Sequence, residues 1–147
     1  MAYYIFNIAQ RERATELMRA GMWGVDAGEP HRDALATGAL VLVYLGAPER
    51  AFIGRAELAK AVHDRTPSET EAYPGNSPSG VLLSHVEEWE PAVPMGAVVQ
   101  RIDPTASDPY VQANAAAGFR TGVVLITGDE YEAAVALSGE TRTSPRR

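Results

Sequence analysis

The sequence predicts an α+β protein, in which short helices flank a small, mostly antiparallel β-barrel or curved sheet of five to six strands. Two observations lead to this prediction. Short runs of β-branched and aromatic residues are separated by turn residues, and successive strands are joined as hairpins rather than through helices. Amphipathic helical patterns occur near both ends of the chain. This mixture favours a sheet that carries its helices on the outside or closes on itself.

The first third predicts a strand over residues 3–7 and a helix over residues 9–20. The helix has apolar residues at helical spacing (Ala14, Leu17 and Met18), and Gly21 is its expected stop. A polar stretch follows, in which Pro30 suits the first turn of a short helix that reaches residue 35.

The middle of the chain predicts a hairpin. Residues 39–45 form a nearly continuous apolar run, which is typical of a strand covered on both faces. Residues 47–50 predict the turn, and residues 51–62 the return strand. Gly54 inside that strand indicates a bulge or a close approach of another backbone.

The second half predicts a long, proline-containing loop over residues 65–80, a strand over 80–93 and a strong strand over 121–127. Residues 97–102 fit a helix or a strand. Thr127 and Glu130 have capping-box spacing and predict a helix over 129–137 that ends at Gly139. We therefore expect a single domain over residues 1–139 and a disordered polar tail over 140–147.

Composition and charge exclude several functional classes. The chain contains no cysteine, which excludes disulfides, thiolate nucleophiles and cysteine-ligated zinc or iron–sulfur sites. We see no signal peptide or membrane span, and expect a cytoplasmic protein. The formal net charge is -6, whereas a protein that holds nucleic acid through many phosphates needs a basic surface. Any nucleic-acid contact is therefore expected to be local.

No catalytic, metal or cofactor motif stands out. The three histidines lie far apart with no ligand spacing, and the glycines form neither a phosphate-binding loop nor a dinucleotide fingerprint. We therefore expect no metal, no cofactor and a non-enzymatic protein.

The remaining candidates are aromatic and amide side chains. Trp23 lies between Gly21 and Gly24, where it is either a plug for the core or the wall of a pocket. Tyr44, Tyr73 in the long loop and Asn7, whose amide can read the edge of a base, complete the set. Stacking a base on an aromatic ring is worth about 1–3 kcal/mol, which is comparable to the few kcal/mol needed to extrude a base from a duplex.

The order of four segments, residues 3–7, 21–25, 40–44 and 53–56, resembles an EVE domain, a PUA-like relative of the YTH domain. The resemblance implies a small β-barrel with a pocket for a modified base, which is modified cytosine in DNA for EVE domains and methylated adenine in RNA for YTH domains. It matches Trp23 to a wall of the YTH aromatic cage. At the position of the second cage tryptophan the chain offers only Tyr73, and Gly24 replaces a small hydroxyl residue.

The resulting hypothesis is a non-enzymatic reader of a modified base in DNA or RNA. Trp23 stacks on the base, Asn7 and the backbone near Gly24 and Val25 read its edge, and Arg32 or Arg55 touches flanking phosphates. Two alternatives stay open. One is a small PUA-like amidohydrolase or ribonuclease that uses Lys60, the only lysine, with Glu57 or a threonine. The other is a binder of a free nucleoside or another small planar molecule.

Overall fold

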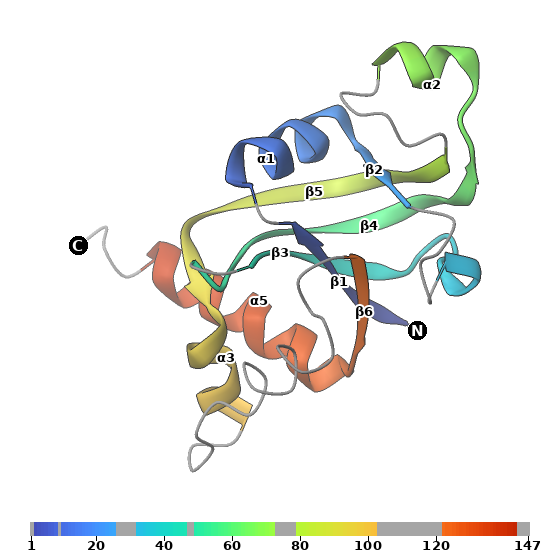
Figure 1. The fold of residues 1–147 in the computed structure, drawn as a ribbon. Coiled ribbons are helices and arrows are strands. Elements are labelled where there is room, and N and C mark those ends of the chain that lie inside the picture. Colours follow the sequence, from blue (N-terminus) through green and yellow to red (C-terminus); the bar gives the residue numbers. More distant parts are fainter. Residues whose placement is uncertain are drawn as a thin grey trace.

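A six-stranded mixed sheet organises the computed structural model, which describes residues 2–8, 10–25, 32–46, 49–72, 79–102 and 122–143. The strand order is β2-β5-β4-β3-β1-β6 (Figure 1). The strands are β1 (Tyr3–Ile8), β2 (Met22–Gly24), β3 (Leu40–Leu45), β4 (Ala51–Asp64), β5 (Ser79–Pro94) and β6 (Gly122–Ile126). None of the helices in the described ranges is long and apolar enough to cross a membrane.

The sheet is open. Strands β2 and β6 form its two edges and do not pair with each other, so the predicted β-barrel is not closed by hydrogen bonds. The predicted α+β class and strand number agree with the structure. The pairing of β1 with β3 is parallel, from Tyr3 beside Leu40 to Ile8 beside Leu45, and the hairpin pattern of the sequence did not indicate it.

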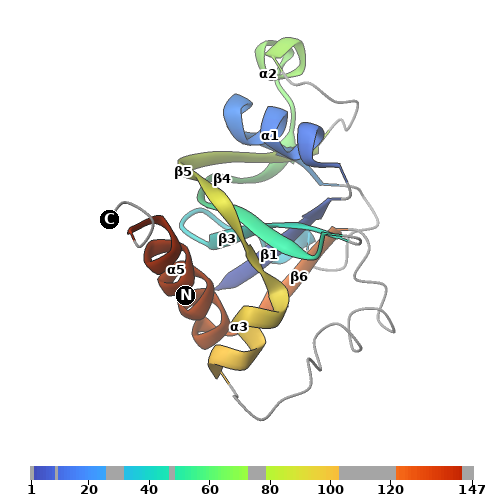
Figure 2. The ribbon, with the colours of Figure 1, turned by 90° about the vertical axis from the view of Figure 1, so that its left-hand side faces the viewer.

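Both faces of the sheet are covered. Helix α1 (Arg11–Ala20) lies on one face, and helices α3 (Met95–Ile102) and α5 (Gly128–Thr143) lie on the other (Figure 2). Alternate side chains of each strand therefore enter two different cores. Phe6 and Val43 belong to the core under α1, and Ile5 and Leu42 belong to the core under α3 and α5. The continuous apolar run of β3 follows from this double burial.

Glycines end α1 and bring β5 close to β4. Gly21 has a left-handed backbone, with φ 71°, and its N–H points to the carbonyls of Leu17 and Met18, as predicted for the helix stop. At Gly54 the pairing of β4 with its neighbours shifts register, and a Cβ atom there would collide with the Glu87 carbonyl and the Met18 methyl. The bulge and close approach predicted for Gly54 are both present.

Three local predictions need correction, and the structure decides the open alternative for residues 97–102. Within the predicted loop over residues 65–80, Pro67–Ala72 form helix α2, which begins with reciprocal hydrogen bonds between Thr66 and Glu69. This capping box was overlooked among the turn residues. Residues 97–102 belong to a helix. Helix α5 continues past Gly139 to Thr143, so that glycine is not its end. In the polar stretch, η1 (Arg32–Ala34) is a single 3₁₀ turn.

The predicted capping box of α5 is present, and it buries a carboxyl group. The Thr127 N–H donates to Glu130 Oε1 at 2.7 Å, and the Glu130 N–H donates to Thr127 Oγ1 at 3.2 Å. Glu130 Oε2 is buried and has no hydrogen-bond partner in the part of the chain that the structure describes. Burial raises the pKa of Glu130, and the hydrogen bond from Thr127 opposes this shift only in part.

Replacing Glu130 with Gln is expected to stabilise the protein near neutral pH. The pKa of Glu130 is raised on folding. Its contribution to the free energy of unfolding is therefore fully present below its ordinary pKa of 4.5 and is lost as the pH rises through the folded pKa. Glutamine keeps the capping acceptor without the charge. Urea unfolding between pH 4.5 and 7.5 should give a flatter pH dependence for the variant than for the native chain.

The matched control is Asp129→Asn, which removes one charge from the same helical turn at an exposed position. It should give no gain, because an exposed carboxylate near a helix N-terminus is weakly stabilising. A Glu130→Gln variant that is less stable than the native chain at pH 7 would contradict the burial argument.

Candidate functional site

Two of the predicted site residues, Gly24 and Val25, lie where edge strand β2 ends. Gly24 pairs with Gly80 at the start of β5, and the Val25 N–H donates to the Ser79 carbonyl at 3.1 Å. Residues 26–31 follow Val25 directly, and residues 73–78 precede Ser79 directly. We call Gly24, Val25, Ser79 and Gly80 the β2 end. Tyr73 lies outside the described residues.

Trp23 is a core side chain in this structure. Only 6% of it is exposed, and its ring centroid lies 5.4 Å from that of Phe6 at an interplanar angle of 34°. Both rings pack in the core under α1. The ring thus fills the core directly beneath an edge strand, at the point of the chain where the resemblance implies a pocket wall.

Asn7 and Tyr44 lie on the other face of the sheet. They are register partners in the parallel β1–β3 pair, so their side chains share a face, and the Tyr44 ring packs 5.1 Å from that of Phe52. Phe6, the neighbour of Asn7, points to the face of Trp23. The structure therefore brings Asn7 and Tyr44 together but does not bring Asn7 and Trp23 onto one ligand surface.

The Asn7 amide is buried. Its side chain is 6% exposed, and neither Nδ2 nor Oδ1 makes a hydrogen bond within the described ranges. Gly46 lies beside it, since a Cβ atom there would be 3.4 Å from Asn7 Oδ1. A buried polar group left unsatisfied costs about 1–3 kcal/mol, so such a group in a native fold calls for a water or a ligand as its explanation.

The predicted phosphate contacts have different environments. Arg32 lies in η1, and its side chain is outside the described part of the structure. Arg55 lies 3.5 Å from Glu87, whose Oε1 also accepts a hydrogen bond of 2.6 Å from Trp89 Nε1. Arg55 is thus already paired with a carboxylate on the sheet surface.

Arg65 was not among the predicted contacts, yet it reaches the β2 end. Its Nη1 donates to Met22 Sδ at 3.8 Å. A Cβ atom on Gly80 would collide with its guanidinium group, so the guanidinium lies directly over the Gly80 backbone. The signal in the sequence was a glycine at the start of a strand, which leaves room for a side chain from elsewhere.

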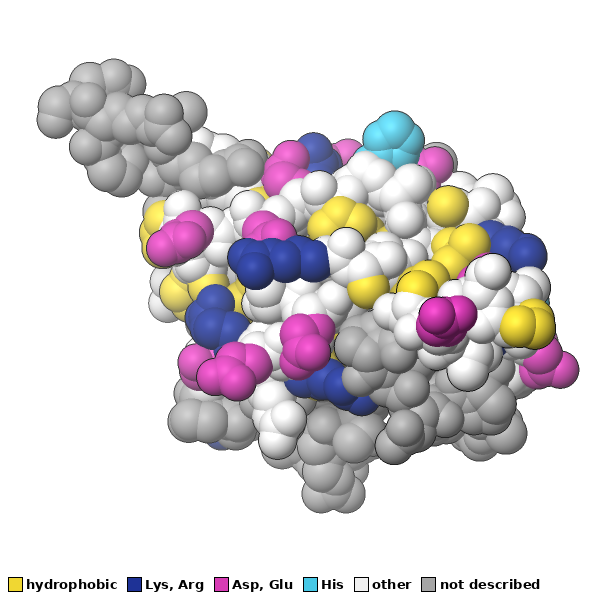
Figure 3. All heavy atoms as spheres, turned by 90° about the horizontal axis from the view of Figure 1, so that it is seen from above, with side chains coloured by type: hydrophobic (Ala, Val, Ile, Leu, Met, Phe, Trp, Pro, Cys, Tyr) yellow, Lys and Arg dark blue, Asp and Glu magenta, His cyan; other side chains and the backbone are white. Residues whose placement is uncertain are grey.

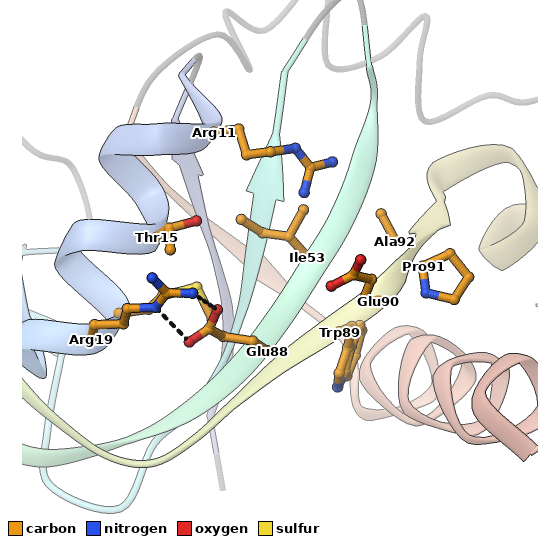
Figure 4. Close-up of a pocket in the computed structure, with 10 residues that line it drawn as sticks. Arg11, Thr15, Arg19, Ile53, Glu88, Trp89, Glu90, Pro91 and Ala92 are labelled. Atoms are coloured by element: carbon orange, nitrogen blue, oxygen red, sulfur yellow. Dashed lines mark hydrogen bonds and ion pairs between the residues drawn. The ribbon is translucent and has the colours of Figure 1, made fainter.

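A cavity of about 580 Å³ lies between α1 and the bent part of β5 (Figure 4). Arg11, Thr15 and Arg19 line it from α1, and Glu88 and Glu90 line it from β5. The Arg19 guanidinium donates two hydrogen bonds to the Glu88 carboxylate, each of 3.2 Å. The floor of the cavity includes Ile53 and Trp89. The Trp89 side chain is only 3% exposed and belongs to the core. Because the two walls carry opposite charges, the cavity does not favour a polyanion.

Lys60, His63 and Ser79 carry the side chains that could take part in catalysis, and they lie in different environments. Lys60 is exposed on β4 and lines neither of the described cavities. Both nitrogens of His63 have partners, the Ala61 carbonyl at 2.7 Å and Glu69 Oε1 at 2.9 Å. Ser79 Oγ donates to Asp64 at 2.8 Å. Across the described ranges, no three His, Asp or Glu side chains gather in a way that could hold a metal ion.

The comparisons with known proteins find likeness in structure only. No family model and no curated protein matches the sequence. A hypothetical protein from Leishmania major is 16% identical and superposes with a TM-score of 0.66 over 97% of each chain. Human THYN1, in complex with DNA that contains 5-methylcytosine, is 15% identical, with a TM-score of 0.58 over 94% of this chain and 98% of that one. The chain thus shares its fold with human THYN1, in agreement with the fold that the resemblance to an EVE domain implies.

An ASCH protein from Zymomonas mobilis is also similar, with 13% identity and a TM-score of 0.53 over 92% of this chain and 94% of that one. Identities this low establish the fold alone. The ligand must therefore be argued from the residues of this chain.

Replacing Asn7 with Leu is expected to stabilise the protein by about 1–3 kcal/mol, because it removes a desolvated amide and fills a similar volume. The free energy of unfolding in urea measures the gain. Asn7→Ala is the control, since it removes the same amide but leaves a cavity, and should be less stable than the leucine variant. A loss of stability in Asn7→Leu would mean that the amide has a partner, such as an ordered water.

Proposed function

We propose that the chain is a non-enzymatic module that binds nucleic acid and reads one modified base, either modified cytosine in DNA or a modified base in RNA. The observation that carries this proposal is the structural likeness to human THYN1, which extends over nearly the whole of both chains. The structure of THYN1 is that of its complex with 5-methylcytosine-containing DNA. The resemblance of residues 21–25 to the segment that carries a cage tryptophan points to the same class of ligand.

The β2 end supplies suitable chemistry for such a ligand. Trp23 provides an aromatic ring on the edge strand itself, and Gly24 lets a ligand approach the backbone without a side chain in the way. Because β2 is an edge strand, its N–H and C=O groups that face away from β5 pair with no other strand of the described sheet, and in this proposal they contact the edge of a base. In this proposal the base displaces part of the packing around Trp23 and stacks on its ring.

The charge of the molecule supports local recognition. Acidic and basic side chains are interspersed over the face that carries α1, and neither sign dominates that view (Figure 3). A net charge of -6 opposes non-specific binding to a polyanion. Affinity must then come from the base itself and from a small number of phosphate contacts.

Two other functions make different use of the structure. A lysine-dependent PUA-like hydrolase is disfavoured by the exposure of Lys60, away from both described cavities. A binder of a free nucleoside-like molecule is favoured by the cavity beside α1, which has a ligand-sized volume and is lined by both arginines and glutamates. The second function would place the ligand near Trp89 instead of Trp23.

Replacing Trp23 with Leu is expected to weaken binding of an oligonucleotide that contains one 5-methylcytosine by about 5- to 150-fold. This range corresponds to the loss of about 1–3 kcal/mol of stacking. Fluorescence anisotropy of labelled single- and double-stranded oligonucleotides, with and without the methyl group, measures the effect at a temperature where circular dichroism shows a folded protein.

Trp89→Leu is the matched control, because it removes a second buried tryptophan on the opposite face of the sheet. It should lose stability but keep the preference for the modified base. Equal loss of binding in both variants would indicate that Trp23 acts only through the fold. Binding of a free nucleoside that depends on Trp89 and not on Trp23 would favour the small-molecule function.

A further inference from the structure

The cavity between α1 and the bent part of β5 has opposite charges on facing walls and an apolar floor between them. Arg11 reaches into it from the first turn of α1, and Glu90 reaches into it from β5 (Figure 4). Ile53 forms part of the floor between these two walls. The cavity volume of about 580 Å³ suits a small organic molecule. The cavity shares no residue with the β2 end, so it is a separate site.

One pair of charges at this cavity is already matched. The Arg19 guanidinium donates two hydrogen bonds to the Glu88 carboxylate, each of 3.2 Å. These two side chains therefore neutralise each other. Recognition of a charged ligand is left to the other two charged residues of the lining, Arg11 and Glu90.

Glu90 offers an unpaired carboxylate to the cavity. Its side chain makes no hydrogen bond or ion pair with any residue in the described part of the chain, and the same holds for the hydroxyl of Thr15 on the opposite wall. A cation that enters the cavity gains a charge-assisted hydrogen bond to Glu90 without breaking an existing one. The β5 wall thus favours an ammonium group.

Arg11 is held only loosely on the α1 wall. Its guanidinium lies 3.8 Å from the Glu49 carboxylate, and the two side chains are 50% and 45% exposed. Ion pairs at such exposed positions contribute little to stability, because both partners stay hydrated and the pair is screened by salt. A ligand carboxylate can therefore replace Glu49 and accept two parallel hydrogen bonds from the guanidinium fork.

We propose that this cavity binds a small linear zwitterion. Its ammonium group contacts Glu90, its carboxylate contacts Arg11, and a short methylene chain lies over Ile53. An uncharged ligand would leave both charges of the site unmatched, and a ligand with a single charge would leave one of them unmatched. Each wall also repels the wrong end of the ligand, which fixes the direction of binding. This inference goes beyond the proposed function and does not depend on base reading at the β2 end.

The test titrates the isotope-labelled native chain with β-alanine, γ-aminobutyrate and ε-aminohexanoate, which differ in the number of methylene groups between their charges. Two-dimensional NMR gives Kd and identifies the backbone amides whose signals move. We expect at least one of these zwitterions to bind with a millimolar Kd and to move the signals of Thr15 and Ala92. Hexylamine and hexanoate, which carry one charge each, should bind about fivefold more weakly.

Single substitutions test the two contacts separately. Glu90→Gln should weaken binding of the zwitterion by about fivefold without weakening binding of hexanoate, because only the ammonium contact is lost. Arg11→Gln should also weaken binding of the zwitterion, but it should not weaken binding of hexylamine. Glu49→Gln should strengthen binding of the zwitterion by about two- to fivefold, because it removes the carboxylate that competes for Arg11. Partial unfolding cannot produce such a gain.

Glu12→Gln is the matched control for Glu90→Gln. It removes the same charge from an exposed position in the first turn of α1 that does not line the cavity, so its affinity should equal that of the native chain.

Three results would overturn the inference. The first is that no zwitterion moves the signals of the cavity residues. The second is that a ligand with one charge binds as tightly as the zwitterions, or that Glu12→Gln weakens binding as much as Glu90→Gln does. The third is that cytidine, which is uncharged, binds at the same amides more tightly than every zwitterion, because the cavity would then suit the nucleoside-like ligand instead.

Discussion

The structure depends on a sheet whose central strands are buried on both faces. Three consecutive residues of β3, Val41, Leu42 and Val43, are fully buried, and they contribute alternately to the core under α1 and to the core under α3 and α5. Because successive residues of a strand point in opposite directions, any two neighbours on a central strand belong to different halves of the molecule. This constraint decides which predicted site residues can meet, and it separates Asn7 from Trp23.

Much of the local structure could be predicted from the sequence, because it depends on neighbours in the chain. The stop of α1 at Gly21 needs only a glycine after an amphipathic run, and the Thr127–Glu130 capping box needs only its spacing. Pairing between distant segments is different. The parallel register of β1 with β3 and the open edges at β2 and β6 arise from long-range contacts, on which hydrophobic periodicity carries no information.

The candidate site shows the same difference between features that depend on neighbours in the chain and features that depend on distant segments. Trp23 was singled out from its flanking glycines, but its orientation toward Phe6 depends on the pairing of β2 with β5. Arg65 was missed because the residues that define its position, Met22 and Gly80, are far from it in sequence. A residue type can mark a possible ligand contact, whereas the face on which it lies follows only from strand register.

An edge strand is both a hazard and an opportunity for a protein of this kind. Its unpaired backbone groups can pair with another chain, and natural proteins commonly limit this by keeping edge strands short. Strand β2 has three residues and ends at Gly24, so it is too short to template a long foreign strand. The same backbone groups, with the Trp23 ring on the core side of the strand, are those that the proposed function uses to contact a base. In that proposal an acidic protein binds a polyanion at one position without a basic surface, because stacking on one base supplies much of the affinity.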